Sequence, residues 1–369
     1  MGTIDAVFDP KRNSLNAIRL LLAVSVVVSH SFAIGKFGPE PQFGGTRLGT
    51  WAVLGFFAVS GFLITSSRLS AKSLLGYYLN RVLRIFPAFL VCMIVVAFVL
   101  APLSLVLDPR ASWSVVNSIT YVLRNLLLYP PELTQPAIGG TLQHVPDRGY
   151  WNGSMWTLFW EFSCYILVGV AVSASRRLLP AMAWIAFTLT TLLSIAIDSG
   201  LLIVPDVAGW ALPLVGAFTA GSLTFLYRSK IRLNAVTLCV CLALIAVVSL
   251  FGVAHSLASA PVAVVIIWLS TVLPLSWVGS RGRPDLSYGM YIYAWPVQQY
   301  LMLIFGQALG VLLMILLSVA LTIPIAYLSF RYIERPAQRW GHALVRTRFQ
   351  TPRAIGRTPK RPPQVDRSI

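Results

Sequence analysis

The feature that most constrains this chain is the repeated occurrence of apolar stretches about as long as a bilayer is thick. A transmembrane helix needs about 20 mostly apolar residues. Such stretches occur at 15–34, 50–66, 84–106, 154–173, 179–197, 209–227, 233–252, 258–277, 287–305 and 309–331. Only 11% of the 369 residues are charged, against about 25% in a soluble domain. We therefore predict an all-α integral membrane protein with about ten transmembrane helices.

The basic residues predict how these helices are oriented. An eleventh, more polar stretch, 113–129, also exists. If it does not span, one side of the membrane receives Lys11 and Arg12, Arg68 and Lys72, Arg176 and Arg177, Arg228, Lys230 and Arg232, Arg281 and Arg283, and the Arg-rich tail. The other side receives Asp108, Glu132, Asp147, Asp198 and Asp206. This positive-inside pattern predicts cytoplasmic termini and makes 113–129 an interfacial or loop helix.

The apolar stretches and the charge pattern together divide the chain into three parts. We predict a cytoplasmic N-terminus at 1–14, a membrane domain at 15–340 with an external loop at 107–153, and a basic, disordered cytoplasmic tail at 341–369. The first apolar stretch, which ends at Ser31-Phe32-Ala33, also imitates a cleavable signal peptide. Cleavage would break the charge pattern, so we favour a retained helix. No soluble catalytic domain is evident, and we expect any chemistry to occur within the membrane region.

The net charge of +17 and the cysteines restrict the partners and cofactors. The basic residues lie between apolar stretches and in the tail, which indicates topology and contact with anionic lipid headgroups rather than nucleic-acid binding. The four cysteines are Cys92, Cys164, Cys239 and Cys241. All lie in apolar stretches without metal-ligand spacing, so we expect neither a bound metal nor a disulfide framework.

The first apolar stretch carries two ionisable residues, Arg19 and His30. Eleven residues at 100° each amount to three turns plus about 20°, so the two side chains share a face, about 16 Å apart along the axis. An ionisable residue inside a membrane helix is costly and is by default a functional candidate. Snorkelling to headgroups is the alternative for Arg19, and a hydrogen-bonded helix interface is the alternative for His30.

Three further sites carry polar groups into or next to the membrane. Arg81 and Arg84 are spaced i and i+3, so they share a helix face at the cytoplasmic entrance of the third span. Two guanidiniums there suit a phosphate-bearing ligand, although ordinary positive-inside flanking is the alternative. Glu161 lies about 10 Å deep, at the depth of His30, and is a candidate to orient it. Its alternative is a structural polar anchor.

The second span contains Ser60-Gly61, which permits close helix approach and leaves a hydroxyl beside any cavity. Small residues at a helix interface explain this pair equally well.

Taken together, these segments resemble the membrane acyltransferase type 3 family, whose members acylate sugars of bacterial surface glycans. The segments, in the family's order over about 15–340, are Arg19 with His30 eleven positions later, Phe56-Phe57-Ala58-Val59-Ser60-Gly61-Phe62, Arg81-Val82-Leu83-Arg84, Ser154-Met155-Trp156-Thr157-Leu158 leading to Glu161, Ser287-Tyr288-Gly289-Met290-Tyr291, and Glu334-Arg335-Pro336. One departure is Ala294, which stands where many members have a histidine before the proline.

The resemblance implies ten membrane helices, an acetyl-CoA or other acyl-CoA donor and a catalytic histidine at His30. It also implies that Arg19, Arg81 and Arg84 serve the donor or the active fold. From its motifs we expect Ser60, Gly61, Trp156 and Tyr288 to line the substrate cavity.

We therefore hypothesise an O-acyltransferase of the cell inner membrane. It would acylate a sugar hydroxyl of an exopolysaccharide, an O-antigen (lipopolysaccharide) or a lipid-linked precursor, with His30 as general base and Glu161 orienting it. The rival hypothesis is a transporter that relays protons through His30 and Glu161, but the chain shows no internal repeat or paired broken helices. A catalytically inactive scaffold is a third possibility.

Overall fold

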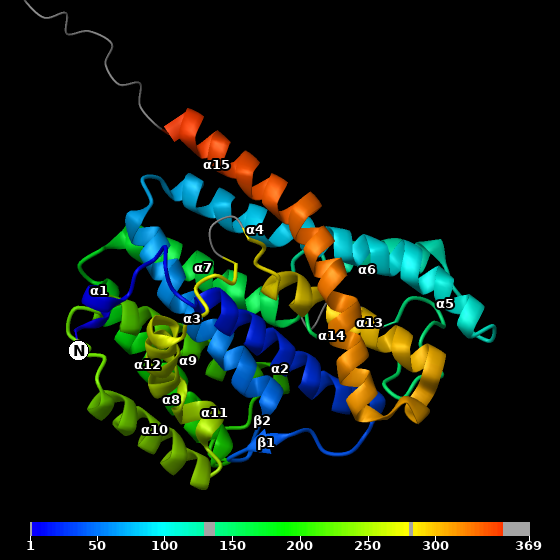
Figure 1. Cartoon of the computed structure of the whole chain (residues 1–369), viewed down its shortest axis with the longest axis horizontal. Helices are drawn as coiled ribbons and strands as arrows, with labels where there is room; N and C mark the ends of the chain where they lie inside the picture. The colour runs from blue at the N-terminus through cyan, green and yellow to red at the C-terminus, as the bar shows by residue number, and fades with distance from the viewer. Residues whose placement is uncertain (1, 129–136, 280–282, 350–369) are drawn as a thin grey trace, which may run out of the picture.

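The computed structural model describes residues 2–128, 137–279 and 283–349, with side chains described as far as Val345. Helices dominate, and one short hairpin interrupts them (Figure 1). The elements are α1 Ile4–Val7, α2 Leu15–Gly35, β1 Gln42–Phe43, β2 Thr46–Arg47, α3 Leu48–Ser70, α4 Leu74–Val95, η1 Val96–Leu100, α5 Ala101–Leu107, α6 Val115–Arg124, α7 Thr157–Ala174, α8 Leu179–Asp198, α9 Asp206–Leu226, α10 Ala235–Leu250, α11 Ala254–Leu257, α12 Ser259–Val272, α13 Ser287–Phe305, η2 Gly306–Leu309, α14 Gly310–Ser329, η3 Phe330–Glu334 and α15 Arg335–Phe349.

The helices are long and apolar enough for a membrane protein. Among the described residues, seven helical stretches reach spanning length, the last of them containing both α13 and α14, and α10 and α12 are shorter apolar helices. Every predicted apolar stretch overlaps one of these helices. The structure therefore confirms a mostly helical membrane fold, whereas the number of spans and the side on which the termini lie remain predictions.

Three predicted boundaries differ from the structure. The third helix begins at Leu74 rather than 84, because Ser73 accepts a hydrogen bond from the Gly76 backbone and caps it. The helix predicted over 258–277 ends at Val272, since the residue before Pro274 avoids helical geometry. The stretch 113–129 forms only the ten-residue α6. At 1.5 Å per residue, α6 is about half a bilayer long, which agrees with an interfacial or loop helix.

Helix α2 is the centre of the bundle. It packs against α3, α12, α13 and α14 (Figure 1). The buried centre of its contact with α13 and α14 is mostly alanine and consists of Ala23, Val27, Met290, Ala294 and Ala326. Small side chains allow two helix backbones to approach closely, and close approach holds both helices in a defined register.

The crossing of α3 and α9 is the closest helix contact around Gly61. A Cβ atom on Gly61 would lie 1.9 Å from the carbonyl oxygen of Phe218, and one on Gly221 would lie 1.9 Å from that of Ala58. Thr65 also donates a hydrogen bond to Ser222 across the same contact. Gly61 therefore occupies a helix interface and not a cavity wall, which is the alternative that the sequence left open.

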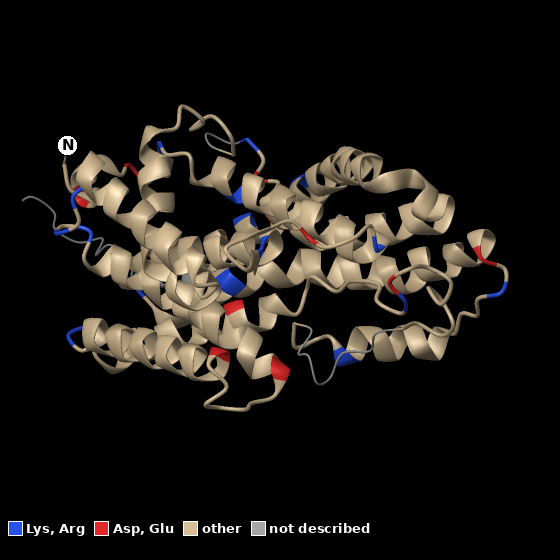
Figure 2. Ribbon diagram, turned by 90° about the horizontal axis from the view of Figure 1, so that it is seen from below, with Lys and Arg blue, Asp and Glu red and all other residues tan. Residues whose placement is uncertain are grey.

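Segments predicted to share one side of the membrane lie together at the same end of the helices. The backbone N–H of Ile4 donates to Ile231, and Arg228 pairs with Asp5 at 2.7 Å. Charged positions are sparse along the helices (Figure 2). Arg281, Glu132 and the tail beyond Phe349 lie outside the described residues.

The predicted external loop is largely packed against the bundle. Trp151 is fully buried and donates to Thr141, and Asn152 donates to the carbonyl of Ile292 on α13. The C-terminal helix α15 lies beside α4 (Figure 1). It extends to Phe349, so residues 341–349 of the tail predicted to be disordered are helical, and the rest of that tail lies outside the described residues.

Candidate active site

Two parallel helices connect a cluster of charges to an open pocket. Arg19 on α2 donates to Asp285, just before α13, at 2.6 Å. Eleven residues later, the His30 ring packs against Trp295 on α13, with 4.6 Å between ring centroids. His30 follows Arg19 by eleven residues, and Trp295 follows Asp285 by ten. Both separations correspond to about 15–16 Å of helix. The two helices therefore hold these groups at opposite ends of one shared contact.

His30 lines a cavity of about 680 Å³, a size typical of small-molecule sites. Its neighbours in the wall include Thr157, Tyr291 and Trp295. The Tyr291 hydroxyl donates to the Ser154 carbonyl and lies 2.5 Å from the Thr157 hydroxyl. No hydrogen bond to the His30 ring is found among the described residues, so its nitrogens are available to a ligand.

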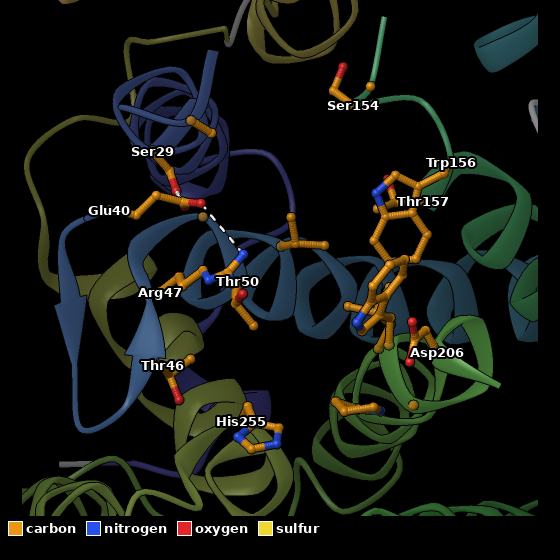
Figure 3. Close-up of a pocket in the computed structure, with 18 of the residues that line it drawn as sticks. Ser29, Glu40, Thr46, Arg47, Thr50, Ser154, Trp156, Thr157, Asp206 and His255 are labelled. Carbon is orange, nitrogen blue, oxygen red and sulfur yellow. Dashed lines mark hydrogen bonds and ion pairs between the residues drawn. The ribbon is translucent and has the colours of Figure 1, made fainter. Parts of the chain in front are cut away.

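One wall of the cavity is formed by the β1–β2 hairpin and the segment before it. Gly44 and Gly45 both have positive φ, at 56° and 71°, as a two-residue hairpin turn requires. The hairpin directs Arg47 toward Glu40, whose carboxylate lies 3.5 Å from the guanidinium. Glu40 also accepts a hydrogen bond from Ser29, the residue next to His30 (Figure 3). The hairpin is thereby tied to the helix that carries the histidine.

The opposite wall carries aromatic groups. Trp156, Thr157 and Asp206 lie across the pocket from Glu40 and Arg47 (Figure 3). The ring of Trp156 lies 5.9 Å from that of Trp210 on α9. Asp198 and His255 also line the cavity and lie 3.0 Å apart, and Ser256 donates a hydrogen bond to Asp198.

The charge cluster lies at the other end of α2 and α13. Asp285 pairs with both Arg19 and Arg84, at 2.6 and 3.3 Å. Burial alone would raise the pKa of Asp285, but the two guanidiniums and a hydrogen bond from Ser287 hold this pKa below its usual range. The Asp285 carboxylate therefore stays ionised and keeps both arginines in place.

Arg81 and Tyr288 lie beside this cluster. The Nε atom of Arg81 is buried and has no hydrogen-bond partner among the described residues. Tyr288 donates to the carbonyl of Ile85, the residue after Arg84. Because α4 begins at Leu74, Arg81 and Arg84 lie two to three turns inside the helix rather than at its entrance. An unsatisfied buried guanidinium is a strong candidate for binding an anion.

Glu161 occupies a third position, between the cluster and the pocket. It accepts hydrogen bonds from Ser60 at 2.6 Å and from Tyr165 at 2.5 Å. Within the described residues it makes no hydrogen bond or ion pair with His30. The described residues therefore show no His30–Glu161 contact, which the transporter hypothesis also required. The structure instead brings together Ser60 and Glu161, which were predicted independently.

The predicted residues thus fall into separate groups. His30 and Trp156 line the pocket, Arg19 and Arg84 share Asp285, and Gly61 belongs to the α3–α9 contact. Ala294 packs in the α2–α13–α14 contact and is not among the residues that line the pocket.

Sequence reasoning missed Asp285 and the pocket residues Glu40, Arg47 and Trp210. The signal for Asp285 was its place as an acidic residue in a basic loop, just before the Ser287-Tyr288 motif.

Comparisons with known proteins identify relatives along nearly the whole chain. The family described as "Acyltransferase domain" matches residues 12–331. A protein named O-acetyl transferase from Shigella phage Sf6 is 28% identical over 330 residues, covering 88% of this chain and 96% of its own length. Nodulation protein 10 of Rhizobium leguminosarum bv. viciae is 26% identical over 389 residues, covering 95% of this chain and 99% of its own length. No solved structure gives a significant match.

Proposed function

This chain belongs to that acyltransferase family, and from this premise we propose that it transfers an acetyl group from cytoplasmic acetyl-CoA to a sugar hydroxyl of an exported glycan. The name of the phage relative, O-acetyl transferase, supports acetyl as the transferred group. The observation that carries the proposal is the placement of His30 in an open cavity, about 16 Å along α2 from the cluster of Arg19, Arg84 and Asp285.

The arginine cluster is the proposed binding site for the donor. Arg81 offers a buried Nε without a partner, and Arg84 is held beside it by Asp285. Guanidiniums bind phosphate oxygens through paired N–H groups, so the phosphates of the CoA donor suit this end of the bundle. The thioester would then reach along α2 and α13 toward the pocket, past Tyr288 and Tyr291.

His30 is the proposed general base. It takes the proton from the acceptor hydroxyl while that oxygen attacks the thioester carbonyl. A carbon–oxygen bond forms, the carbon–sulfur bond breaks, and the departing CoA thiolate takes the proton from the imidazolium. Such general-base catalysis is typically worth about 10²–10⁴-fold.

Glu161 is a positioning residue in this proposal. Its hydrogen bonds join α3 to α7 through Ser60 and keep Tyr165 in place. It would thus position these helices and not the histidine.

The orientation in the membrane is part of the same proposal. We place the protein in the inner membrane with both termini in the cytoplasm, the arginine cluster on the donor side and the pocket on the external side. A reporter fused after α15 that is active only in the cytoplasm should then be active. A reporter inserted between β1 and β2 should be inactive.

The direct test is His30→Ala. Cells that express this variant should contain at least about 100-fold less acetylated surface and lipid-linked glycan, as measured by mass spectrometry, at equal membrane levels of protein. His342→Ala, which changes an exposed histidine on α15, is the matched control and should retain activity. Wild-type acetylation by membrane-inserted His30→Ala protein would refute the proposed role.

A further inference from the structure

One face of α9 lines the pocket, and nothing in the sequence motifs points to it. Asp206, Gly209, Trp210 and Pro213 follow the i, i+3, i+4, i+7 spacing of a single helix face, and all four contribute to the wall. The α3–α9 contact at Gly61 and Gly221 holds this helix rigidly against the bundle. The face is therefore a fixed part of the site.

Trp156 and Trp210 form an aromatic platform on this face. Their ring centroids are 5.9 Å apart and the ring planes are inclined by 57°. Trp210 is 58% exposed even though it borders the cavity. Such an indole offers a flat apolar surface of the kind that stacks on the C–H face of a pyranose ring. Asp206, one turn before Trp210, is exposed and makes no hydrogen bond among the described residues, so its carboxylate is free to accept from sugar hydroxyls.

The charges of the pocket restrict the sugar further. The lining contains three carboxylates, Glu40, Asp198 and Asp206, and one guanidinium, Arg47, which is paired with Glu40. It also contains two histidines, His30 and His255, and His255 is paired with Asp198. A sugar that carries a carboxylate would meet like charges, and no unpaired lysine or arginine is found among the described lining residues to compensate for them. Hydroxyl groups can donate to these carboxylates instead. The pocket thus favours an uncharged sugar.

We infer that the N-terminal face of α9, together with Trp156, is a subsite for a neutral pyranose that stacks on Trp210 opposite the Glu40–Arg47 hairpin. The inference rests on the proposed acyl transfer only in taking this sugar as part of the acceptor. Binding itself does not require His30 to be catalytic. Trp210 becomes a specificity-determining residue, and Asp206 anchors the sugar hydroxyls.

Gly209 provides a steric test that does not disturb the fold. A Cβ atom on Gly209 would have open space, with nothing within 4 Å. Gly209→Phe should therefore fold, since replacing glycine in a helix improves helix propensity, while its ring fills the pocket. The alternative role for Trp210, an anchor at the membrane interface, predicts no such sensitivity.

The experiment measures binding of maltotriose, mannotriose, chitotriose and trigalacturonate to the purified full-length protein by saturation-transfer NMR. At least one neutral trisaccharide should bind more tightly than trigalacturonate. Trp210→Ala should raise its Kd about three- to tenfold, Gly209→Phe should abolish binding, and Trp340→Ala, an exposed tryptophan on α15, should have no effect.

Tighter binding of trigalacturonate, absence of binding by every neutral probe at millimolar concentration, or unchanged binding by Gly209→Phe would overturn the inference. Binding is measured without the acyl donor, so it reports on the α9 subsite whether or not His30→Ala abolishes acetylation. Failure of the catalytic proposal therefore leaves this result intact, and the two failures are distinguishable.

Discussion

The two ends of the α2–α13 contact differ in how their polar groups are satisfied. At the arginine end, Asp285 holds two guanidiniums at 2.6 and 3.3 Å, and its side chain is 19% exposed. At the pocket end, His30 and Asp206 have no hydrogen-bond partners among the described residues and border about 680 Å³ of open volume. Paired charges hold a structure in place, whereas unpaired groups beside a cavity are available for exchange with a substrate. Loss of the shared carboxylate at the first end should thus cost stability in addition to any effect on donor binding, whereas substitutions at the second end should cost function without a large loss of stability.

The largest effect on stability is expected from Asp285→Ala. It leaves Arg19 and Arg84 without their shared carboxylate, and breaking a buried ion pair from one side costs about 3–5 kcal/mol. Asp206→Ala, at the pocket end, should change stability by less than about 0.5 kcal/mol. Thermal unfolding in detergent measures both variants. Equal stability losses would remove the distinction between the two ends.

The next effect separates two glycines. Gly61→Ala places a Cβ atom against the Phe218 carbonyl and forces α3 and α9 apart, at a cost of about 1–3 kcal/mol. Gly209→Ala meets open space and should leave stability unchanged or slightly higher. The comparison uses the same unfolding measurement. A Gly61→Ala protein as stable as the wild type would show that the helix crossing is looser than described.

A comparable effect distinguishes two serine–glutamate hydrogen bonds. Ser60→Ala removes a donor from Glu161, away from the open pocket, and should cost about 1.5–3 kcal/mol. Ser29→Ala removes a donor from Glu40, which borders the pocket and keeps Arg47, so water can replace the bond and the cost should stay below about 1 kcal/mol. If Ser29→Ala proves the more damaging, Glu40 is less accessible to water than its position indicates.

The smallest effect lies outside both ends, in the loop predicted to be external, where His144 Nδ1 lies 2.5 Å from a carboxylate oxygen of Asp108. The hydrogen bond from His144, opposed by burial and aided by Arg110, lowers the pKa of Asp108 below its ordinary value of about 3.9. A carboxyl with a lowered folded-state pKa stabilises the fold above the unfolded-state pKa and loses this contribution as pH falls through the folded-state value. Stability should thus decline slightly below about pH 4.

Asp108→Asn tests this assignment by the same pH titration of unfolding. The variant should lack that part of the acid dependence, because the amide does not titrate. An unchanged acid profile would show that the Asp108–His144 contact contributes nothing to stability.

Much of the fold was predictable because membrane helices are encoded locally. A run of about 20 apolar residues has few alternatives in a bilayer, so each predicted stretch coincides with a helix. The errors fall where a local cap or a proline decides the boundary, as at Ser73 and Pro274. The short α6 was also anticipated, because Asn117, Arg124 and Asn125 make that stretch too polar to span.

The candidate site was predictable only in part. Helical periodicity correctly anticipates that Arg19 and His30 occupy one side of α2, since both contact α13. It gave the wrong partner for His30, because depth in a membrane does not determine which helices are neighbours. Glu161 accepts hydrogen bonds from Ser60 and Tyr165.

The sequence by itself therefore determined that this is a membrane protein, where its apolar helices lie and how its candidate residues are spaced along each helix. All of these depend on residues that are close together in the chain. Only the tertiary structure decided that Arg19 meets Asp285, 266 residues away, that Ser60 meets Glu161, 101 residues away, and that the hairpin faces Trp156 and α9 across the pocket. Such contacts depend on how several helices pack together, and no local pattern of residue types determines that packing.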